Sequence, residues 1–292
     1  MRNSLNRKGI ILAGGRGTRL YPLTLAMSKC ILPIYDKPMI YYSLSTLMLS
    51  GIKNILVISA PDDIANYSKL IGDGEKFGIS VSYEIQPNPD GIAQALTIGE
   101  KFLDNCPSAL MLADNIFYGD GLEVKLMESS AKSHSTVFSY KVHDPERFGI
   151  CEIDENKKVV SLEEKPNKPK SDLAVTGLYF YDSNAPDIAK NIKPSGRGEL
   201  EITDVNIKYM NSNSLYAEVL DHSYMWIDAG TQQSFLKASN SIKKVEDNTG
   251  RKIMCPEEIA FNKGYISAED LDEVAEKNLN SEYGKYLKTL IK

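Results

Sequence analysis

Cysteine is scarce in this sequence, and long apolar stretches are missing. The four cysteines lie far apart and form no C-x-x-C pair, which argues against a zinc site or a disulfide framework and fits reduced cytoplasmic thiols. No stretch reaches the ~20 apolar residues that cross a membrane, and no apolar segment of signal-peptide length precedes the first predicted strand. We therefore expect a soluble, cytoplasmic protein without a membrane partner.

An excess of positive charge is also missing. The formal net charge is −5 at pH 7, so a broad basic surface for nucleic acid is not indicated. The only histidines, His134, His143 and His222, show no spacing typical of metal ligands. The 292 residues, 42% of them hydrophobic, can bury a large core, and no repeat or long linker interrupts them. We expect a single folding unit with a helical tail.

Apolar runs alternate with helical patterns over the first part of the chain. Continuous apolar runs predict strands at residues 8–13, 54–59, 80–86 and 108–113. Helices are predicted between them at residues 37–51, 61–71 and 91–103. Because the runs are continuously apolar rather than alternating, the pattern predicts an α/β fold with a mostly parallel sheet covered by helices on both faces.

The second half has a different pattern. Short strands are predicted at residues 136–142, 150–153, 159–164, 174–181 and 215–220, which would extend the sheet in mixed orientation. Helices are predicted at residues 205–210 and 232–246, with Thr231 as a candidate cap of the second. Residues 256–290 are helical in composition and contain no obvious catalytic cluster.

Polar residues follow the predicted strands. Residues 14–19 form a loop with three glycines, a threonine and two arginines; Gln86 begins a turn, and Asp114 and Asn115 follow a strand. Ligands of parallel sheets bind beyond the carboxyl ends of the strands, so these groups should converge. Glycine lets backbone N–H groups approach phosphate, and arginine adds a fork of donors. Two aspartates, Asp114 and Asp228, suffice to hold Mg²⁺ together with substrate phosphates, which points to phosphoryl or nucleotidyl transfer.

Each of these residues also has an ordinary structural interpretation. Asp114 could form a strand-end turn, and Asp228 could stabilise a helix start. Lys29 could be a solvated surface lysine, Gln86 a loop residue and Trp226 part of the core.

The motifs together resemble the sugar-nucleotide pyrophosphorylases, and among them the glucose-1-phosphate thymidylyltransferases. The resemblance covers nearly the whole chain. It rests on these segments: GGRGTRL (14–20) with Ser28, Lys29 and Pro33, YDKPMIYY (35–42), QPNPDGIAQA (86–95), LEEKP (162–166), VTGLYFYD (175–182), RGELEITD (197–204) and CPEEIA (255–260). It implies a Rossmann-like, mostly parallel sheet flanked by helices, with a mixed-sheet extension that binds sugar and C-terminal helices.

The resemblance also implies a site in which glucose 1-phosphate attacks the α-phosphorus of dTTP and pyrophosphate leaves, with Mg²⁺ as cofactor. The implied nucleotide-binding residues are Leu12, Gly14, Gly15, Gly17, Thr18, Arg19, Lys29, Gln86, Pro89, Gly91 and Asp114. The implied sugar-binding residues are Asn115, Gly149, Glu164, Lys165, Val175, Tyr179, Arg197 and Trp226. Asp114 and Asp228 would bind Mg²⁺, and Arg19, Lys29 and Lys165 would offset the charge of the phosphates.

The resemblance further implies a homotetramer that begins dTDP-deoxysugar synthesis of the dTDP-rhamnose type. Residues 1–292 would form one domain, with a catalytic core over about 8–240 and a helical interface segment over about 241–292. A dTDP-linked deoxysugar would inhibit the enzyme at an interface site. The candidate residues of that site are Tyr118, Gly119, Lys252, Glu258 and Ile259. Three residues depart from the family pattern: Cys30 replaces a common glutamine, Phe148 a tyrosine and Ala229 a threonine.

Three other functions would use some of the same residues. UTP could replace dTTP, because a glutamine amide satisfies thymine and uracil alike. A dinucleotide fingerprint fails on spacing, because Leu20 stands at the third glycine position. The third alternative is a homologue that binds nucleotide without catalysis. The presence of Lys29, Asp114 and Asp228 together argues against it, whereas Cys30, in place of the family's usual glutamine, is the one feature that favours it.

Overall fold

The central feature is a nine-stranded sheet built around four parallel strands. The computed structural model describes residues 6–291. The parallel strands are β1 (Lys8–Ala13), β4 (Asn54–Ser59), β5 (Ser80–Ile85) and β6 (Ser108–Leu112). They lie in the order β6-β1-β4-β5. The chain thus moves outward from β1 through β4 to β5 and returns to the other side of β1 as β6. The strand order reverses between β1 and β6, and such a switch point opens a crevice at the carboxyl ends of the strands.

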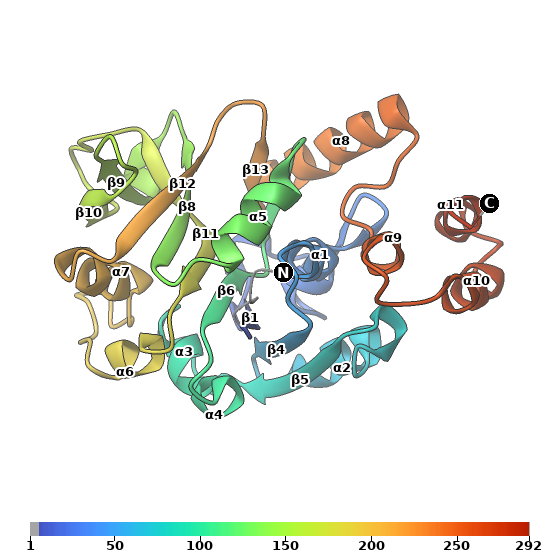
Figure 1. Ribbon diagram of the computed structural model, residues 1–292, viewed down its shortest axis with the longest axis horizontal. Coiled ribbons are helices and arrows are strands. Elements are labelled where there is room, and N and C mark those ends of the chain that lie inside the picture. The colour runs from blue at the N-terminus through green and yellow to red at the C-terminus, as the bar shows by residue number, and fades with distance from the viewer. Residues whose placement is uncertain (1–5, 292) are drawn as a thin grey trace.

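Both faces of the parallel strands are buried. Ile11 and Val57 belong to one core cluster with residues of α1 (Met39–Leu49), whereas the alternate residues Ile10 and Leu56 belong to a second cluster with residues of α3 (Gln94–Ile98). Successive side chains of a strand point to opposite faces, so each apolar run serves two cores. The predicted α/β fold with helices on both faces is confirmed (Figure 1).

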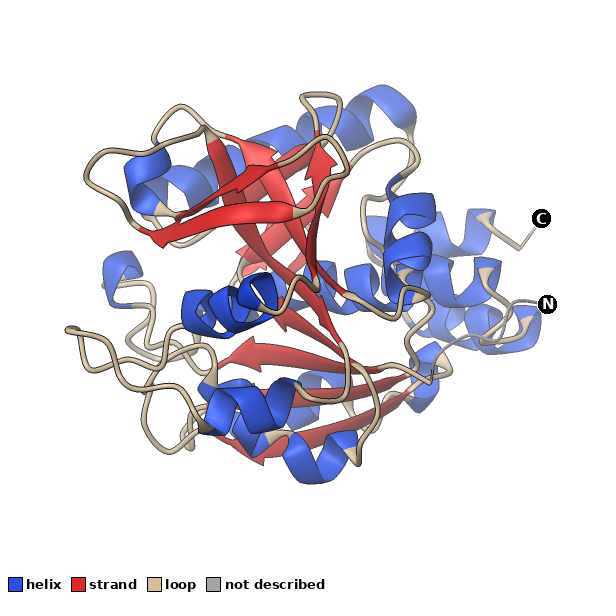
Figure 2. Cartoon of the chain, turned by 60° about the vertical axis from the view of Figure 1, so that its left-hand side comes forward, coloured by secondary structure: helices blue, strands red, loops and turns tan. Residues whose placement is uncertain are grey.

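A mixed extension widens the sheet beyond β6 (Figure 2). The strand β11 (Leu173–Tyr181) runs antiparallel to β6, and it also pairs with β8 (Ser135–Lys141) and β9 (Gly149–Ile153). The strand β10 (Val159–Glu164) pairs with β9, and β12 (Leu215–Leu220) pairs with β8. The register of β11 shifts between Val175 and Tyr179, so this segment can leave the ladder and face the crevice.

A separate two-stranded ribbon joins the two halves of the chain. The strands β7 (Asn115–Tyr118) and β13 (Met225–Asp228) are antiparallel, with Asp228 opposite Asn115. The backbone N–H of Ala229 donates to the carbonyl oxygen of Asp114 at 2.9 Å. The helix α8 (Gln232–Thr249) follows directly, and the Thr231 side chain caps it as predicted.

The remaining helices are short. They are α2 (Ile64–Ile71), α4 (Glu100–Leu103), α5 (Leu122–Ser130), α6 (Ala185–Lys190), α7 (Ile202–Asn211), α9 (Pro256–Asn262), α10 (Ala268–Lys277) and α11 (Glu282–Thr289). One-turn 3-10 helices occur at Thr18–Leu20, Lys29–Ile31, Glu75–Phe77 and Pro145–Arg147. The helix α9 packs against α1, and α10 and α11 lie at the opposite side of the molecule from β9 and β10 (Figure 1). None of the helices within residues 6–291 is long and apolar enough to cross a membrane.

Several predicted boundaries are wrong. The helix predicted at 37–51 begins at Met39, because Lys37–Pro38 form the strand β3, which pairs with β2 (Pro33–Ile34). The helix predicted at 91–103 is split into α3 and α4 at Gly99, and the helix predicted at 61–71 begins at Ile64. The predicted division near residue 240 falls within α8; a separate interface segment stays a prediction.

Candidate functional site

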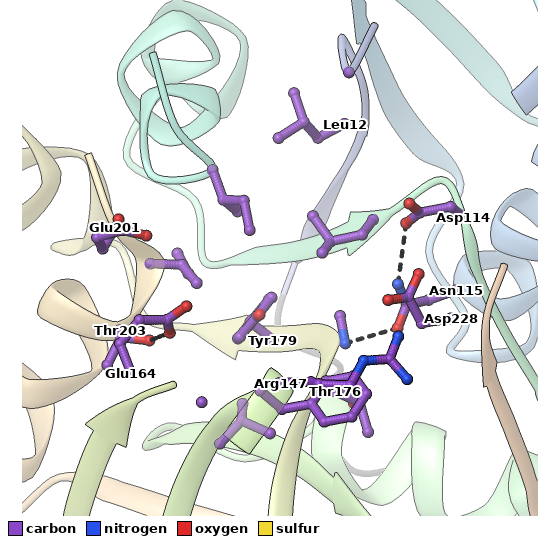
Figure 3. Close-up of a pocket in the computed structure, with 18 of the residues that line it drawn as sticks. Leu12, Asp114, Asn115, Arg147, Glu164, Thr176, Tyr179, Glu201, Thr203 and Asp228 are labelled. Carbon is purple, nitrogen blue, oxygen red and sulfur yellow. Dashed lines mark hydrogen bonds between the residues drawn. The ribbon is translucent and has the colours of Figure 1, made fainter. Parts of the chain in front are cut away.

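A cavity of about 400 Å³ lies beyond the carboxyl ends of β1 and β6, at the switch point. Many of the predicted site residues line it, from both halves of the chain. They are Leu12, Gly15, Arg19, Lys29, Asp114, Asn115, Gly149, Glu164, Lys165, Val175, Tyr179, Trp226 and Asp228. Figure 3 shows Asp114, Asn115 and Asp228 at one end of this cavity, Glu164, Glu201 and Thr203 at the other, and Tyr179 between them. The sequence prediction of two convergent halves is thus matched by their placement.

Four charged side chains form the first end of the cavity. The ammonium of Lys29 donates a hydrogen bond to Asp114, and both side chains are only 13% exposed. Burial lowers the pKa of Lys29, but the negative charges of Asp114 and Asp228 raise it by more than burial lowers it. The pKa of Lys29 therefore lies above its ordinary value. Burial likewise raises the pKa of Asp114, but Lys29 and the amide of Asn115 lower it below the ordinary value. Lys29 and Asp114 are therefore both charged at neutral pH.

Asp228 is less well compensated. Burial and the nearby charge of Asp114 raise its pKa, which Lys29 and Arg19 offset only in part. Its Oδ1 accepts a hydrogen bond from the backbone N–H of Gly230 at 3.1 Å. Two buried carboxylates that repel each other fit a divalent cation, and Mg²⁺ commonly uses one or two carboxylates plus substrate phosphates. Among residues 6–291, no group of three or more histidine, cysteine or acidic side chains is placed to hold a metal ion.

Asn115 connects this end to the rest of the cavity wall. Its Oδ1 accepts hydrogen bonds from the backbone N–H of Gly177 at 3.0 Å and from the indole of Trp226 at 2.7 Å. Its Nδ2 donates to Oδ1 of Asp114 at 3.1 Å. The amide of Asn115 therefore orients Asp114 and Trp226, and its predicted contact with sugar stays a prediction.

The other end of the cavity is acidic and hydrogen-bonded. Thr203 donates to Oε2 of Glu164 at 2.5 Å, and this contact is drawn in Figure 3. Arg197 does not line the cavity, but its Nη2 lies 2.8 Å from Oε1 of Glu201 and 3.5 Å from Oε1 of Glu164. Lys165 lies beside Glu164, with its Nζ 3.5 Å from Oε1. These groups offer paired acceptors and cations suited to sugar hydroxyls and a phosphate.

Aromatic rings line the middle of the cavity. Phe148 and Trp226 have ring centroids 5.3 Å apart, and Tyr179 is 4% exposed. Burial and the charge of Glu164 raise the pKa of Tyr179, so its hydroxyl stays neutral. The structure adds lining residues to which no role was assigned from sequence. They are Ala13, Ile92, Leu112, Arg147, Thr176, Gly177, Glu199, Glu201, Ile202, Thr203 and Asn206.

The remaining nucleotide-binding candidates border the cavity rather than line it. Gly14 and Gly17 belong to the loop after β1, and Thr18 begins the 3-10 helix that follows it. Gln86, Pro89 and Gly91 belong to the turn after β5. The two segments touch, since a Cβ at Gly14 would lie 2.0 Å from Oε1 of Gln86. Only glycine allows this approach at position 14.

Cys30 lies in the hydrophobic core rather than in the cavity wall. Its side chain is 1% exposed, and burial raises the pKa of its thiol to about 12. Cys30 is therefore a neutral core residue that follows Lys29, and its effect on nucleotide affinity stays a prediction.

The candidate regulatory residues lie outside the cavity. Lys252 pairs with Asp36 at 2.6 Å and with Glu246 at 2.7 Å. Glu258 accepts a hydrogen bond from the Tyr286 hydroxyl at 2.7 Å. Ile259 is buried in α9, Tyr118 ends β7, and Gly119 follows it. Their regulatory role stays a prediction.

The sequence and fold match known proteins. Residues 8–245 match the family described as Nucleotidyl transferase. A glucose-1-phosphate thymidylyltransferase from Neisseria meningitidis is 53% identical over 286 residues, which cover 98% of this chain and 99% of that protein. A crystal structure of a Bacillus anthracis protein with bound sucrose, described provisionally as a glucose-1-phosphate thymidylyltransferase, is 41% identical with a TM-score of 0.73 and covers 80% of this chain and 94% of its own.

A second solved structure, UDP-glucose pyrophosphorylase complexed with UDP-glucose, is 25% identical with a TM-score of 0.72, and it covers 82% of this chain and 99% of its own. With a family model matched over residues 8–245 and a relative at 53% identity, the chain belongs to the nucleotidyl transferase family, among the relatives named glucose-1-phosphate thymidylyltransferase.

Proposed function

We propose that the protein transfers a thymidylyl group from dTTP to α-D-glucose 1-phosphate, forming dTDP-glucose and pyrophosphate. The observation that carries this proposal is the cavity at the switch point, with a balanced cluster of acids and cations at one end and sugar-type hydrogen-bond partners at the other. The names of relatives that align over nearly the whole chain support the same activity.

The proposed reaction is a direct in-line displacement. A phosphate oxygen of the sugar phosphate forms a bond to the α-phosphorus of dTTP. The bond from the α-phosphorus to the bridging oxygen breaks, and its electron pair leaves with pyrophosphate. No residue needs to form a covalent intermediate, so the protein contributes positioning and charge neutralisation.

Each end of the cavity has a role in this reaction. Lys29 and Arg19 would neutralise the triphosphate, and Lys165 would hold the attacking sugar phosphate at the far end. Glu164, oriented by Thr203, would accept hydrogen bonds from sugar hydroxyls. Asp114 and Asp228 would hold Mg²⁺, which supplies charge neutralisation to the phosphates when it is bound.

UTP is the second candidate nucleotide. The likeness to a UDP-glucose pyrophosphorylase structure favours it, and thymine and uracil present the same hydrogen-bonding edge to a glutamine amide. Selection between the two nucleotides would depend on the 5-methyl group and on the 2′ position of the ribose.

Assembly and regulation extend the proposal. We infer a cytoplasmic homotetramer that begins dTDP-deoxysugar synthesis of the dTDP-rhamnose type and is inhibited by a dTDP-linked deoxysugar. Tyr118, Gly119, Lys252, Glu258 and Ile259 would form the inhibitor site. Their support is the family to which the chain belongs and their position outside the cavity.

One assay tests the central reaction. The purified protein is incubated with glucose 1-phosphate and, in turn, dTTP, UTP, CTP, ATP and GTP, with Mg²⁺ or with a chelator, and pyrophosphate release is measured. Release with dTTP that needs Mg²⁺ is expected, and Asp228→Asn should abolish it. Asp104→Asn is the matched control, because this exposed aspartate precedes β6 at the opposite end of the sheet. Absence of Mg²⁺-dependent release with every pyrimidine nucleotide would refute the proposal.

A further inference from the structure

The base-reading candidate Gln86 begins a chain of hydrogen bonds that runs through two further polar side chains, Gln94 and Asp90. The Nε2 of Gln86 donates to Oε1 of Gln94 at 2.7 Å. The Nε2 of Gln94 donates in turn to Oδ2 of Asp90 at 3.1 Å. A weaker contact joins Nε2 of Gln86 to the carbonyl oxygen of Gly91 at 3.4 Å. The Asp90 carboxylate thus ends a relay that runs through two amides.

The carboxylate determines the direction of this relay. An ionised aspartate only accepts hydrogen bonds, whereas an amide can present either its NH₂ group or its oxygen. Because Asp90 only accepts, Gln94 must turn its NH₂ group toward Asp90 and its oxygen toward Gln86. Gln86 must then turn its NH₂ group toward Gln94, which leaves Oε1 on the opposite side.

That oxygen faces the nucleotide loop. Gln86 is 4% exposed, and its Oε1 accepts no hydrogen bond from any group within residues 6–291. It lies against Gly14, where a Cβ would be 2.0 Å away. Oε1 of Gln86 is not among the fully buried side-chain atoms that lack a partner, so this free acceptor beside the glycine loop can be reached by a ligand donor.

The relay is anchored to the sugar-binding end of the site. The carbonyl oxygen of Asp90 accepts a hydrogen bond from the backbone N–H of Leu200 at 2.7 Å, and the Leu200 carbonyl accepts one from Ala93 at 3.1 Å. A Cβ at Gly91, whose φ is +116°, would lie 2.3 Å from the Leu200 oxygen. The segment that carries Asp90 is therefore held in place by residues next to Glu201.

We propose that Gln94 and Asp90 are positioning residues that fix the Gln86 amide with its oxygen toward the base, so that the site selects pyrimidines that carry an N3–H group. This inference rests on the proposed nucleotidyl transfer. Thymine and uracil donate from N3 and satisfy Oε1 of Gln86. Cytosine has an acceptor at N3, and it would set two lone pairs against each other and leave Oε1 unpaired.

The test compares kcat/KM for dTTP, UTP and CTP in variants of the relay. Gln94→Met removes the polar partner while keeping similar length, so Gln86 can turn over. The ratio of kcat/KM for dTTP to that for CTP should fall by about tenfold, the value of one hydrogen bond. Asp90→Asn should lower the same ratio, because an amide can donate to Gln94 and reverse the relay. The double variant Asp90→Asn/Gln94→Glu keeps an acceptor facing Gln86 and a donor facing residue 94, so it should retain the wild-type ratio.

A control variant and two contrary results separate the inference from a structural role of Gln94 and from failure of the proposed function. Asp104→Asn should leave all three values unchanged, since this side chain has no part in the relay. A merely structural role of Gln94 would lower kcat/KM for the three nucleotides by the same factor, and that result in both Gln94→Met and Asp90→Asn would overturn the inference. If the wild-type protein releases no pyrophosphate with dTTP or UTP, the proposed function itself fails instead.

Discussion

Replacing Lys29 by methionine should destabilise the protein in a way that depends on pH. Lys29 and Arg19 balance Asp114 and Asp228, and the Lys29 ammonium is bonded directly to Asp114. The substitution keeps most of the side-chain volume but removes the cation. It leaves two buried carboxylates close together with only Arg19 to compensate them, which is the unfavourable state of a broken buried ion pair.

The expected loss is about 3 kcal/mol of unfolding free energy near pH 8, since removing one partner of a buried pair costs about 3–5 kcal/mol and this pair borders an open cavity. The change of this stability loss with pH follows from the carboxyl pKa in the wild type and in the variant. In the wild type, Lys29 holds the pKa of Asp114 low, which stabilises the fold above the ordinary aspartate pKa of about 4. In the variant, the carboxyl pKa rises above that value, so protonation relieves the repulsion as the pH falls.

Urea unfolding of wild type and Lys29→Met at pH 5, 6.5 and 8, in the presence of a chelator, measures this difference. The gap in stability should widen as the pH rises, and the double variant Lys29→Met/Asp114→Asn should lose less than Lys29→Met alone. Lys243→Met is the matched control, because Lys243 pairs with Asp247 on the exposed surface of α8 and should change little. A gap of equal size at all three pH values would refute the electrostatic reasoning and point to packing alone.

Four further substitutions have definite expected outcomes. Asp228→Asn should raise stability in chelator above pH 5, as judged by thermal unfolding, because it removes the repulsion that raises the Asp228 pKa. Arg7→Met should lower the free energy of urea unfolding by about 3 kcal/mol, because this 4%-exposed guanidinium satisfies several main-chain carbonyls. Gly91→Ala should raise the KM for dTTP several-fold, because a Cβ would collide with the Leu200 carbonyl. Cys30→Gln should alter the KM for dTTP, and an unchanged KM would contradict the prediction that Cys30, in place of the family's glutamine, affects nucleotide affinity.

The central sheet was predictable because its signal is local. Continuous apolar runs identify strands that are buried on both faces, and the helical patterns between them imply parallel pairing. Ile10 and Ile11 illustrate the reason: neighbours in one run pack into two separate cores, so neither can be polar. The glycine loop and Asp114 were identified by their position directly after such runs.

The ribbon of β7 and β13 was not predictable in the same way. Each strand has four residues, and their partners come from distant parts of the chain. Nothing in the local sequence of either strand determines that Asp228 lies opposite Asn115. Likewise, Thr203 belongs to a recognised motif, but only the packing of α7 on β10 brings its hydroxyl to Glu164.

The balance of charges in the site explains why residue type and position after a strand were enough to predict which charged residues belong to it. Lys29 and Arg19 come from two one-turn helices after β1, whereas Asp114 and Asp228 follow β6 and end β13. Buried charges are tolerated only when they compensate one another, so each of these residues needs the others in the folded protein. A sequence pattern can therefore identify the members of such a site by their charge and their place after strands. It cannot determine which cation bonds which acid, because Lys29 and Asp114 meet only in the folded protein and the position of Asp228 depends on a ribbon between segments more than a hundred residues apart.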